Sequence, residues 1–195
     1  MSALNPGYYD EHQLREIGFK NVGENVRVAK NCTVIGVQNI SLGNNVRIDG
    51  YCTITAPDAG WVKVGSFVHI GGYCLLIGGS GIEMNDYSGL SQGVKVYSRS
   101  DDYSGDHMTN PTVPEKYTCV KDGLVSIGRH VIVGAGSVIL PGVAIGEGSA
   151  IGAQSLVRKN VDAWGIFSGS PIKRLTSRSR KLIKLEEEMV QKHST

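Results

Sequence analysis

The sequence predicts an all-β solenoid, in which one short repeat winds around a single axis. An aliphatic residue returns at every sixth position between residues 127 and 162; these residues are Ile127, Val133, Ile139, Ile145, Ile151 and Val157. Glycine follows four of them, and a small or β-branched residue stands four places after each. A period of six fits neither a helix nor simple strand alternation. It fits a three-sided coil whose aliphatic residues point inward and whose glycines allow tight corners.

Length, charge and hydropathy limit the class of protein. The chain has 195 residues, enough for a single domain (residues 1–195) with a real core. The formal net charge is +2, without the long basic run that marks a nucleic-acid binder. No apolar run reaches the roughly 18 residues of a membrane span, and the first residues lack a signal pattern. We therefore expect a cytoplasmic protein with no transmembrane segment.

The N-terminal cap comprises residues 1–21. Asp10 can cap a short helix over residues 11–17, which Gly18 ends. Leu14 and Ile17 are expected to face the first coil, and the helix covers the open end of the solenoid, as a terminal element must.

The repeats fill residues 22–162 and predict about six coils. Their ranges are 22–39, 42–59, 64–81, 84–101, 127–144 and 145–162. Three of the four cysteines, at positions 32, 52 and 74, fall at a small inward position of the repeat, where cysteine acts as a small buried hydrophobe. The cysteines show no metal-binding spacing.

A long segment, residues 98–124, interrupts the repeats after coil four. A loop of this length inside a compact domain is usually functional or disordered. Tyr103 and Tyr117, with Pro111 and Pro114 restricting the backbone, favour an ordered arm.

Residues 163–195 follow the repeats. Residues 163–175 are predicted to form an extended exit strand, and residues 178–193 an amphipathic helix with Leu182, Ile183 or Leu185, and Met189 on its apolar stripe. Packing of this stripe within the chain is favoured over partner binding.

Residues 20–175 resemble the hexapeptide-repeat acyltransferases, whose fold is a left-handed parallel β-helix. The resemblance rests on the repeats, on the arm after coil four, and on the segment SGSPIK at residues 168–173, which is similar to the exit motif of that family. Bacterial sugar O-acetyltransferases of the maltose, galactoside and surface-polysaccharide type are the most similar group. The left hand of the coil comes from this resemblance alone, because the general crossover rule predicts a right hand.

The resemblance implies an acetyl-CoA-dependent O-acetyltransferase acting on a sugar or sugar-containing acceptor, such as a nucleotide sugar, in surface polysaccharide or lipopolysaccharide biosynthesis. It also implies a homotrimer with active sites between subunits and no required metal. Ala135 and Ala153 match positions where the pantetheine arm of the cofactor lies flat on the coil. Basic residues suited to the phosphates of CoA match at Arg158, Lys159 and Lys173, and Arg174 stands beside the last of these. Many relatives have tryptophan at the position of Ile132.

Acyl transfer to a hydroxyl requires a base, and histidine suits this role near neutral pH. His12 and His193 belong to the terminal helices, and His130 at a corner of coil five is interpreted as structural. His69 points outward, and Asp101 has the same outward phase on another side of the next coil.

In a parallel trimer the sides that carry His69 and Asp101 can face each other. We therefore expect His69 to be the base and Asp101 its orienting partner or a contact to the acceptor. Asp102 is expected to bind a sugar hydroxyl. His107 on the arm is the second candidate for the base and a substrate contact.

The chain departs from the maltose and galactoside enzymes at these two positions. Their catalytic histidine matches Asp101, and their active-site asparagine matches His69. Three alternatives therefore stay open: an N-acetyltransferase of an amino sugar, a non-catalytic scaffold or binding module, and a zinc enzyme of the γ-carbonic anhydrase type. The last lacks the closely spaced outward histidine pair that a zinc site of that type needs.

Overall fold

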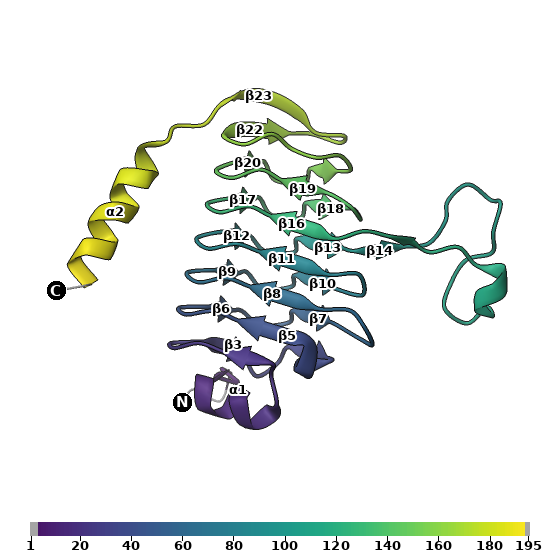
Figure 1. Cartoon of the computed structure of the whole chain (residues 1–195), viewed down its shortest axis with the longest axis horizontal. Coiled ribbons are helices and arrows are strands. Elements are labelled where there is room, and N and C mark those ends of the chain that lie inside the picture. The colour runs from purple at the N-terminus through teal and green to yellow at the C-terminus, as the bar shows by residue number, and fades with distance from the viewer. Residues whose placement is uncertain (1–3, 194–195) are drawn as a thin grey trace.

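The structure, a computed structural model, describes residues 4–193 and is a parallel β-helix (Figure 1). Each coil contributes one strand to each of three sheets. The first sheet contains β2 (Asn21–Val22), β5 (Ile40–Leu42), β8 (Val62–Val64), β11 (Ile82–Met84), β16 (Val125–Ile127) and β19 (Ala144–Ile145).

The second sheet carries the candidate site. Its strands are β1 (Tyr8–Tyr9), β3 (Arg27–Ala29), β6 (Arg47–Ile48), β9 (His69–Ile70), β12 (Gly89–Leu90), β17 (Ile132–Val133), β20 (Ala150–Ile151), β22 (Gly165–Ser168) and β23 (Lys173–Ser177). The third sheet contains β4 (Thr33–Ile35), β7 (Thr53–Thr55), β10 (Leu75–Ile77), β13 (Lys95–Tyr97), β18 (Val138–Ile139) and β21 (Leu156–Val157).

The solenoid is longer than the repeat count predicted. Six complete coils are followed by the start of a seventh, in which Val161 bridges Ile145 and β22 pairs with β20 in parallel. The predicted fold class is confirmed, and the prediction of about six coils was short by this partial turn.

The aliphatic position of each repeat forms the core. Ile70, Leu76 and Ile127 have no exposed surface, and the column of which they are part runs from the first coil to the last. Parallel pairing places each of these residues directly above its equivalent in the previous coil, as for Leu76 on Ile54.

Leu76→Ala is expected to lower the free energy of unfolding by about 2–5 kcal/mol, because the tightly packed column leaves a cavity that it cannot refill. Chemical denaturation of the variant and the wild type measures the difference. Substitution of the exposed Leu185 by alanine is the control, and an equal effect of both changes would contradict the assignment of Leu76 to the core.

The cysteines follow the predicted pattern. Cys52 and Cys74 are buried and Cys32 is half-buried in the column of the third sheet, and their thiols donate to the backbone carbonyls of Gly71, Ser91 and Asp49 respectively. Cys119, on the arm, is exposed, and all four are free thiols.

The N-terminal cap is formed by β1 and α1 (Glu11–Ile17). Asp10 and Gln13 make a reciprocal capping box, and Gly18 ends the helix in the left-handed conformation. Leu14 is buried as predicted, but Ile17 is exposed, so the prediction that both face the first coil was wrong for Ile17. Strand β1 pairs antiparallel with β3 and extends the second sheet.

The arm is ordered and projects away from the solenoid (Figure 1). Its base is an antiparallel pair, β14 (Arg99–Ser100) with β15 (Lys121–Asp122), and its far part contains the 3-10 turn η2 (Glu115–Tyr117). The Arg99 Nε lies 2.7 Å from the Asp122 carboxylate across this pair. A second 3-10 turn, η1 (Val37–Asn39), closes the first coil.

The C-terminal segment differs from the prediction in one respect. The predicted single exit strand is instead a hairpin, because Gly169, with a φ of 111°, turns the chain back so that β23 pairs with β22. Helix α2 (Lys181–His193) begins three residues later than predicted and runs back beside the solenoid. The side chain of His193 lies outside the described part.

Helix α2 is attached through polar contacts as well as through its apolar stripe. The Glu186 carboxylate contacts the Arg129 guanidinium, and lies 2.6 Å from Nε2 of His130. Leu182 is half-buried, whereas Leu185 is exposed, so the predicted stripe packs only in part. Within residues 4–193 neither helix has the length and apolar character needed to cross a membrane.

Candidate active site

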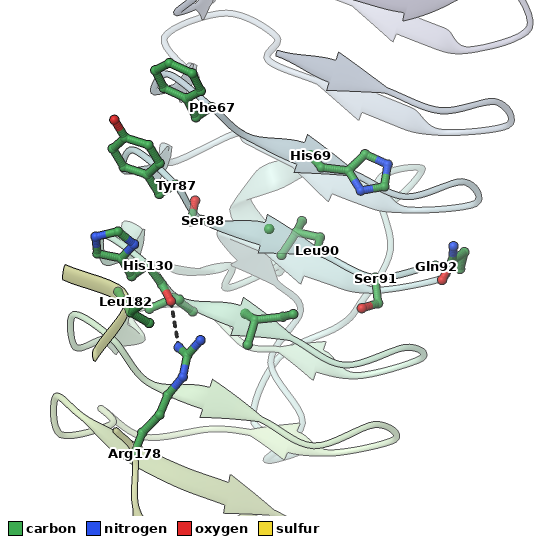
Figure 2. Close-up of a pocket in the computed structure, with 13 residues that line it drawn as sticks. Phe67, His69, Tyr87, Ser88, Leu90, Ser91, Gln92, His130, Arg178 and Leu182 are labelled. Atoms are coloured by element: carbon green, nitrogen blue, oxygen red, sulfur yellow. Dashed lines mark hydrogen bonds between the residues drawn. The ribbon is translucent and has the colours of Figure 1, made fainter. Parts of the chain in front are cut away.

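A cleft of about 480 Å³ opens on the outer face of the second sheet, centred on Gly89. Register explains it: Gly89 stands between His69 on β9 and Ile132 on β17, and it has no side chain to fill the space between them. The nearest atom to a Cβ built on Gly89 is 3.5 Å away. His69, Ser91 and Gln92 lie along one side of this space in Figure 2.

The opposite wall is an aromatic column at the corner between the first and second sheets. Phe67 stacks on Tyr87 with ring centroids 4.9 Å apart, and Tyr87 stacks on His130 at 5.1 Å. All three have a positive φ, which the tight corner requires. His130 is buried and paired with Glu186, so it has structural partners, in agreement with its interpretation from sequence.

The C-terminal segment completes this wall. The Arg178 guanidinium donates hydrogen bonds to the backbone carbonyls of His130, Gly148 and Ser149, and Figure 2 shows the first of these bonds. Burial lowers the pKa of Arg178. Leu182 of α2 lines the cleft beside it.

His69 has a partner that the sequence reasoning missed. Its Nε2 lies 2.8 Å from Oδ2 of Asp49 in the preceding coil. Burial would raise the pKa of Asp49, but hydrogen bonds from His69, Arg47 and Tyr8 outweigh it and keep the pKa below its ordinary value. The signal was present in the sequence, since Asp49 and His69 flank equivalent inward isoleucines of adjacent coils.

Asp101 lies on another side of the prism. It lines a second cleft, about 750 Å³, between the arm and the outer face of the third sheet, with Tyr97 and Tyr103 among its neighbours. Within one chain Asp101 and His69 are therefore apart. The repeat phase predicted this, because it placed them on different sides of the prism.

Asp102 and His107 do come together, at the base of the arm. Asp102 is buried, His107 Nδ1 lies 3.2 Å from its Oδ2, and Lys121 Nζ lies 3.3 Å from its Oδ1. Hydrogen bonds from the Ser104 hydroxyl and backbone, then from His107, hold the pKa of Asp102 far below its ordinary value. These contacts give Asp102 a role in ordering the arm, and binding of a sugar hydroxyl by this residue stays a prediction.

Asp102→Asn is expected to loosen the arm, measured as faster amide hydrogen exchange over residues 103–121. Because the pKa in the folded state is lowered, the stabilisation is complete above the ordinary aspartate value of about 4 and is lost as the pH falls through the lowered value. The difference from wild type should be present at pH 7 and shrink below about pH 4. Asp106→Asn, in the same arm, is the control; equal exchange in both variants at pH 7 would refute the role of Asp102.

The positions expected to hold CoA lie on later coils. Ala135 and Ala153 stand on one edge of the prism, and the backbone N–H of Gln154 donates to the carbonyl of Ala135 across it at 2.8 Å. The coils touch closely there, since a Cβ on Gly134 would lie 2.5 Å from the backbone nitrogen of Ala153. The basic residues expected to serve the phosphates are all exposed: Arg158, Lys159, Lys173 and Arg174.

The described residues contain no group of three or more histidine, cysteine, aspartate or glutamate side chains arranged to hold a metal ion. His69, His107 and His130, the histidines outside the terminal helices, would have to meet in a zinc site, but one chain keeps them apart: His69 is on the second sheet, His107 on the arm, and His130 against α2.

The coil architecture and the corner-by-corner repeat define a hexapeptide-repeat protein, and the chain belongs to the hexapeptide-repeat acyltransferase family. The pattern described as bacterial transferase hexapeptide (six repeats) matches residues 125–159. Among curated proteins, the chain is 45% identical over 179 residues to dTDP-4-amino-4,6-dideoxy-D-glucose acyltransferase of Escherichia coli, covering 92% of this chain and 93% of that protein.

Comparison with solved structures also places the chain in this family. AntD, an N-acyltransferase from Bacillus cereus solved with dTDP and 3-hydroxybutyryl-CoA, is 40% identical, with a TM-score of 0.93 and coverage of 98% of this chain and 100% of AntD. Other AntD structures carry a substitution of one aspartate or of one serine. A maltose O-acetyltransferase from Clostridium difficile 630, at 23% identity, TM-score 0.58 and coverage of 87% and 75%, shares the fold.

The protein is therefore an acyltransferase of a family that uses CoA thioesters and acts on sugars.

Proposed function

We propose that this protein transfers an acyl group from acyl-CoA to the amino group of a nucleoside-diphosphate-linked amino sugar. The relatives that match over nearly the whole chain act on, or were solved with, such compounds. N-acylation, one of the alternatives left open by the sequence, is thus favoured over the expected O-acetylation.

One observation carries the assignment of the site. The serine and the aspartate substituted in AntD stand ten positions apart. In the sequence of this chain, one serine is followed by an aspartate ten positions later, and these two residues are Ser91 and Asp101. Ser91 lines the cleft around Gly89, and its hydroxyl has no hydrogen-bond partner in the described part of the chain.

The chemistry of an amine supports a carboxylate at position 101. A hydroxyl must lose its proton as it attacks, which favours a histidine base. A neutral amine attacks with its lone pair, and its nitrogen becomes strongly acidic only as the bond to the thioester carbon forms, so a carboxylate is a sufficient acceptor for that proton. The proposal therefore reverses the expected roles: Asp101 is the base, and His69 contacts the acceptor.

The complete site needs a second copy of the chain. We propose a homotrimer in which the outer face of the second sheet of one copy meets the arm and third sheet of the next, so that Ser91 and Asp101 come from different copies. Ser91 then donates a hydrogen bond to the carbonyl oxygen of the thioester as it gains negative charge. A cytoplasmic location and a place in surface-polysaccharide synthesis belong to the same proposal.

The donor fits the later coils. The small residues at Ala135 and Ala153 leave a flat edge for the pantetheine arm, and the basic side chains of Arg158 and Lys159 have no ion-pair partner among the described residues, which suits the phosphates of CoA. CoA supplies the activated acyl group, while the chain binds and orients it.

The test is an acyl-transfer assay with purified protein, acetyl-CoA and 3-hydroxybutyryl-CoA as donors. The acceptors are dTDP-4-amino-4,6-dideoxyglucose, the same sugar with a hydroxyl in place of the amine, and maltose. We expect CoA release with the amino sugar alone. Release with the hydroxyl compounds alone would restore O-acetylation, and no release, with no change of melting temperature on adding acyl-CoA, would favour a scaffold.

A further inference from the structure

Asp49 lies at the centre of a polar network beside the cleft. Its Oδ1 accepts hydrogen bonds from Arg47 Nε at 2.7 Å and from the Tyr8 hydroxyl at 3.0 Å, and its Oδ2 lies 2.8 Å from His69 Nε2. Tyr8 lies on β1, Arg47 on β6 and His69 on β9, and Asp49 directly follows β6, so the network joins the N-terminal cap to the second and third coils. The Asp49 side chain is 19% exposed, whereas His69 is 51% exposed.

The network fixes which nitrogen of His69 carries the proton. An ionised carboxylate only accepts hydrogen bonds, and the lowered pKa of Asp49 keeps it ionised at neutral pH. The neutral imidazole must then place its hydrogen on Nε2, which leaves a lone pair on Nδ1.

Nδ1 faces the empty part of the cleft. Nε2 contacts Asp49 in the preceding coil, and the residue opposite His69 in the following coil is Gly89, which has no side chain. In Figure 2 the free ring nitrogen of His69 points toward the strand that carries Leu90, with Ser91 at its end. A hydrogen-bond acceptor is thus directed into the space beside Ser91.

We propose that Asp49 is a positioning residue that holds His69 in the Nε2–H tautomer, so that Nδ1 accepts a hydrogen bond from an N–H or O–H group of the acceptor. This inference rests on the proposed function, since it names a contact to the acceptor of that reaction. Arg47 and Tyr8 hold the carboxylate in place and satisfy its other oxygen. The remaining side chains at the cleft near His69, Ser91 and Gln92, carry no charge.

The first test reads the tautomer directly. The wild type with ¹⁵N-labelled histidine, at pH 8.5, should give His69 signals of a protonated Nε2 and an unprotonated Nδ1. In Asp49→Asn the side-chain amide can donate a hydrogen bond to Nε2 of His69. The spectrum should then show an unprotonated Nε2 and a protonated Nδ1. A wild-type spectrum with the proton on Nδ1 would overturn the proposal, whether or not the protein acylates any sugar.

The second test separates positioning from folding. Asp49→Asn is expected to raise KM for the amino-sugar acceptor about tenfold, the size of one lost hydrogen bond, with KM for acyl-CoA unchanged. His69→Ala should do the same, and the double variant should add little. Asp49→Glu should restore part of the loss.

Glu83→Gln is the matched control, because it removes a carboxylate from a similar cross-strand ion pair, with Lys63 at 2.9 Å, on the first sheet away from the cleft. An unchanged acceptor KM in Asp49→Asn, or an equal rise in Glu83→Gln, would refute the proposal. Absence of turnover in the wild type would instead refute the proposed function, and the tautomer measurement would still decide the role of Asp49.

Discussion

Asp101→Asn is expected to lower kcat with the amino-sugar acceptor by roughly 10²- to 10⁴-fold, the usual contribution of a general base. The amide has nearly the shape of the carboxylate but cannot take the proton released as the amide product forms. KM for acyl-CoA should change little, because Asp101 lies on the side of the arm and not on the coils expected to hold the donor. Steady-state kinetics with each substrate varied in turn measures both effects.

Asp106→Asn serves as the control for Asp101→Asn, since Asp106 is exposed on the same arm. Turnover near that of the wild type in Asp101→Asn, together with a loss of 10²-fold or more in His69→Ala, would return the role of base to His69.

Gly89→Leu is expected to lower the turnover rate by at least roughly 10²-fold without loss of stability. Gly89 lies on a strand, and a Cβ built on it would be in ordinary contact with the His69 carbonyl oxygen at 3.5 Å, so a larger residue fits the backbone and projects into the cleft beside His69. Displacement of a substrate by about 1 Å is enough for a loss of this size. Kinetics and thermal unfolding, measured together, check the two halves of the prediction.

Gly142→Ala, at another edge of the prism, is the control for Gly89→Leu. A Cβ built on Gly142 would meet no atom within 4 Å, and Gly142 lies between the third and first sheets, away from the cleft. Gly142→Ala should keep full activity, with some loss of stability because its φ is 77°. Full activity in Gly89→Leu would show that the cleft is not the site of reaction.

These two inactive variants also test whether the site spans two copies. Asp101→Asn removes the carboxylate that the arm side of the site contributes, and Gly89→Leu blocks the part of the site on the second sheet. A mixed trimer can therefore contain one intact site, made from the second sheet of an Asp101→Asn copy and the arm of a Gly89→Leu copy. Unfolding and refolding the two variants together should recover part of the activity, whereas refolding each alone should recover none.

The fold could be predicted from sequence because the repeat places one aliphatic residue on each side of every coil. Ile70, Leu76 and Ile127 needed no information beyond their spacing. The exit hairpin was missed because its turn depends on the positive φ of Gly169, which carries no periodic signal.

The candidate site could be predicted only in part. Repeat phase identified His69 and Asp101 as outward residues on different sides, which the structure agrees with. The partnership of His69 with Asp49 was missed, because it appears only when the equivalent isoleucines Ile48 and Ile70 of adjacent coils are aligned and their polar neighbours are compared. Repeat phase also did not reveal the cleft, which exists because a glycine happens to face His69 in the register of adjacent coils.

The distribution of thiols has a practical consequence. All four cysteines are among the described residues, and three lie inside or at the edge of the column while Cys119 is exposed on the arm. A thiol-reactive fluorophore should therefore attach to the native protein at one place, without mutagenesis. The label at Cys119 would lie on the arm. Changes in the fluorescence emission of this label as acyl-CoA and acceptor are added would report movement of the arm during turnover.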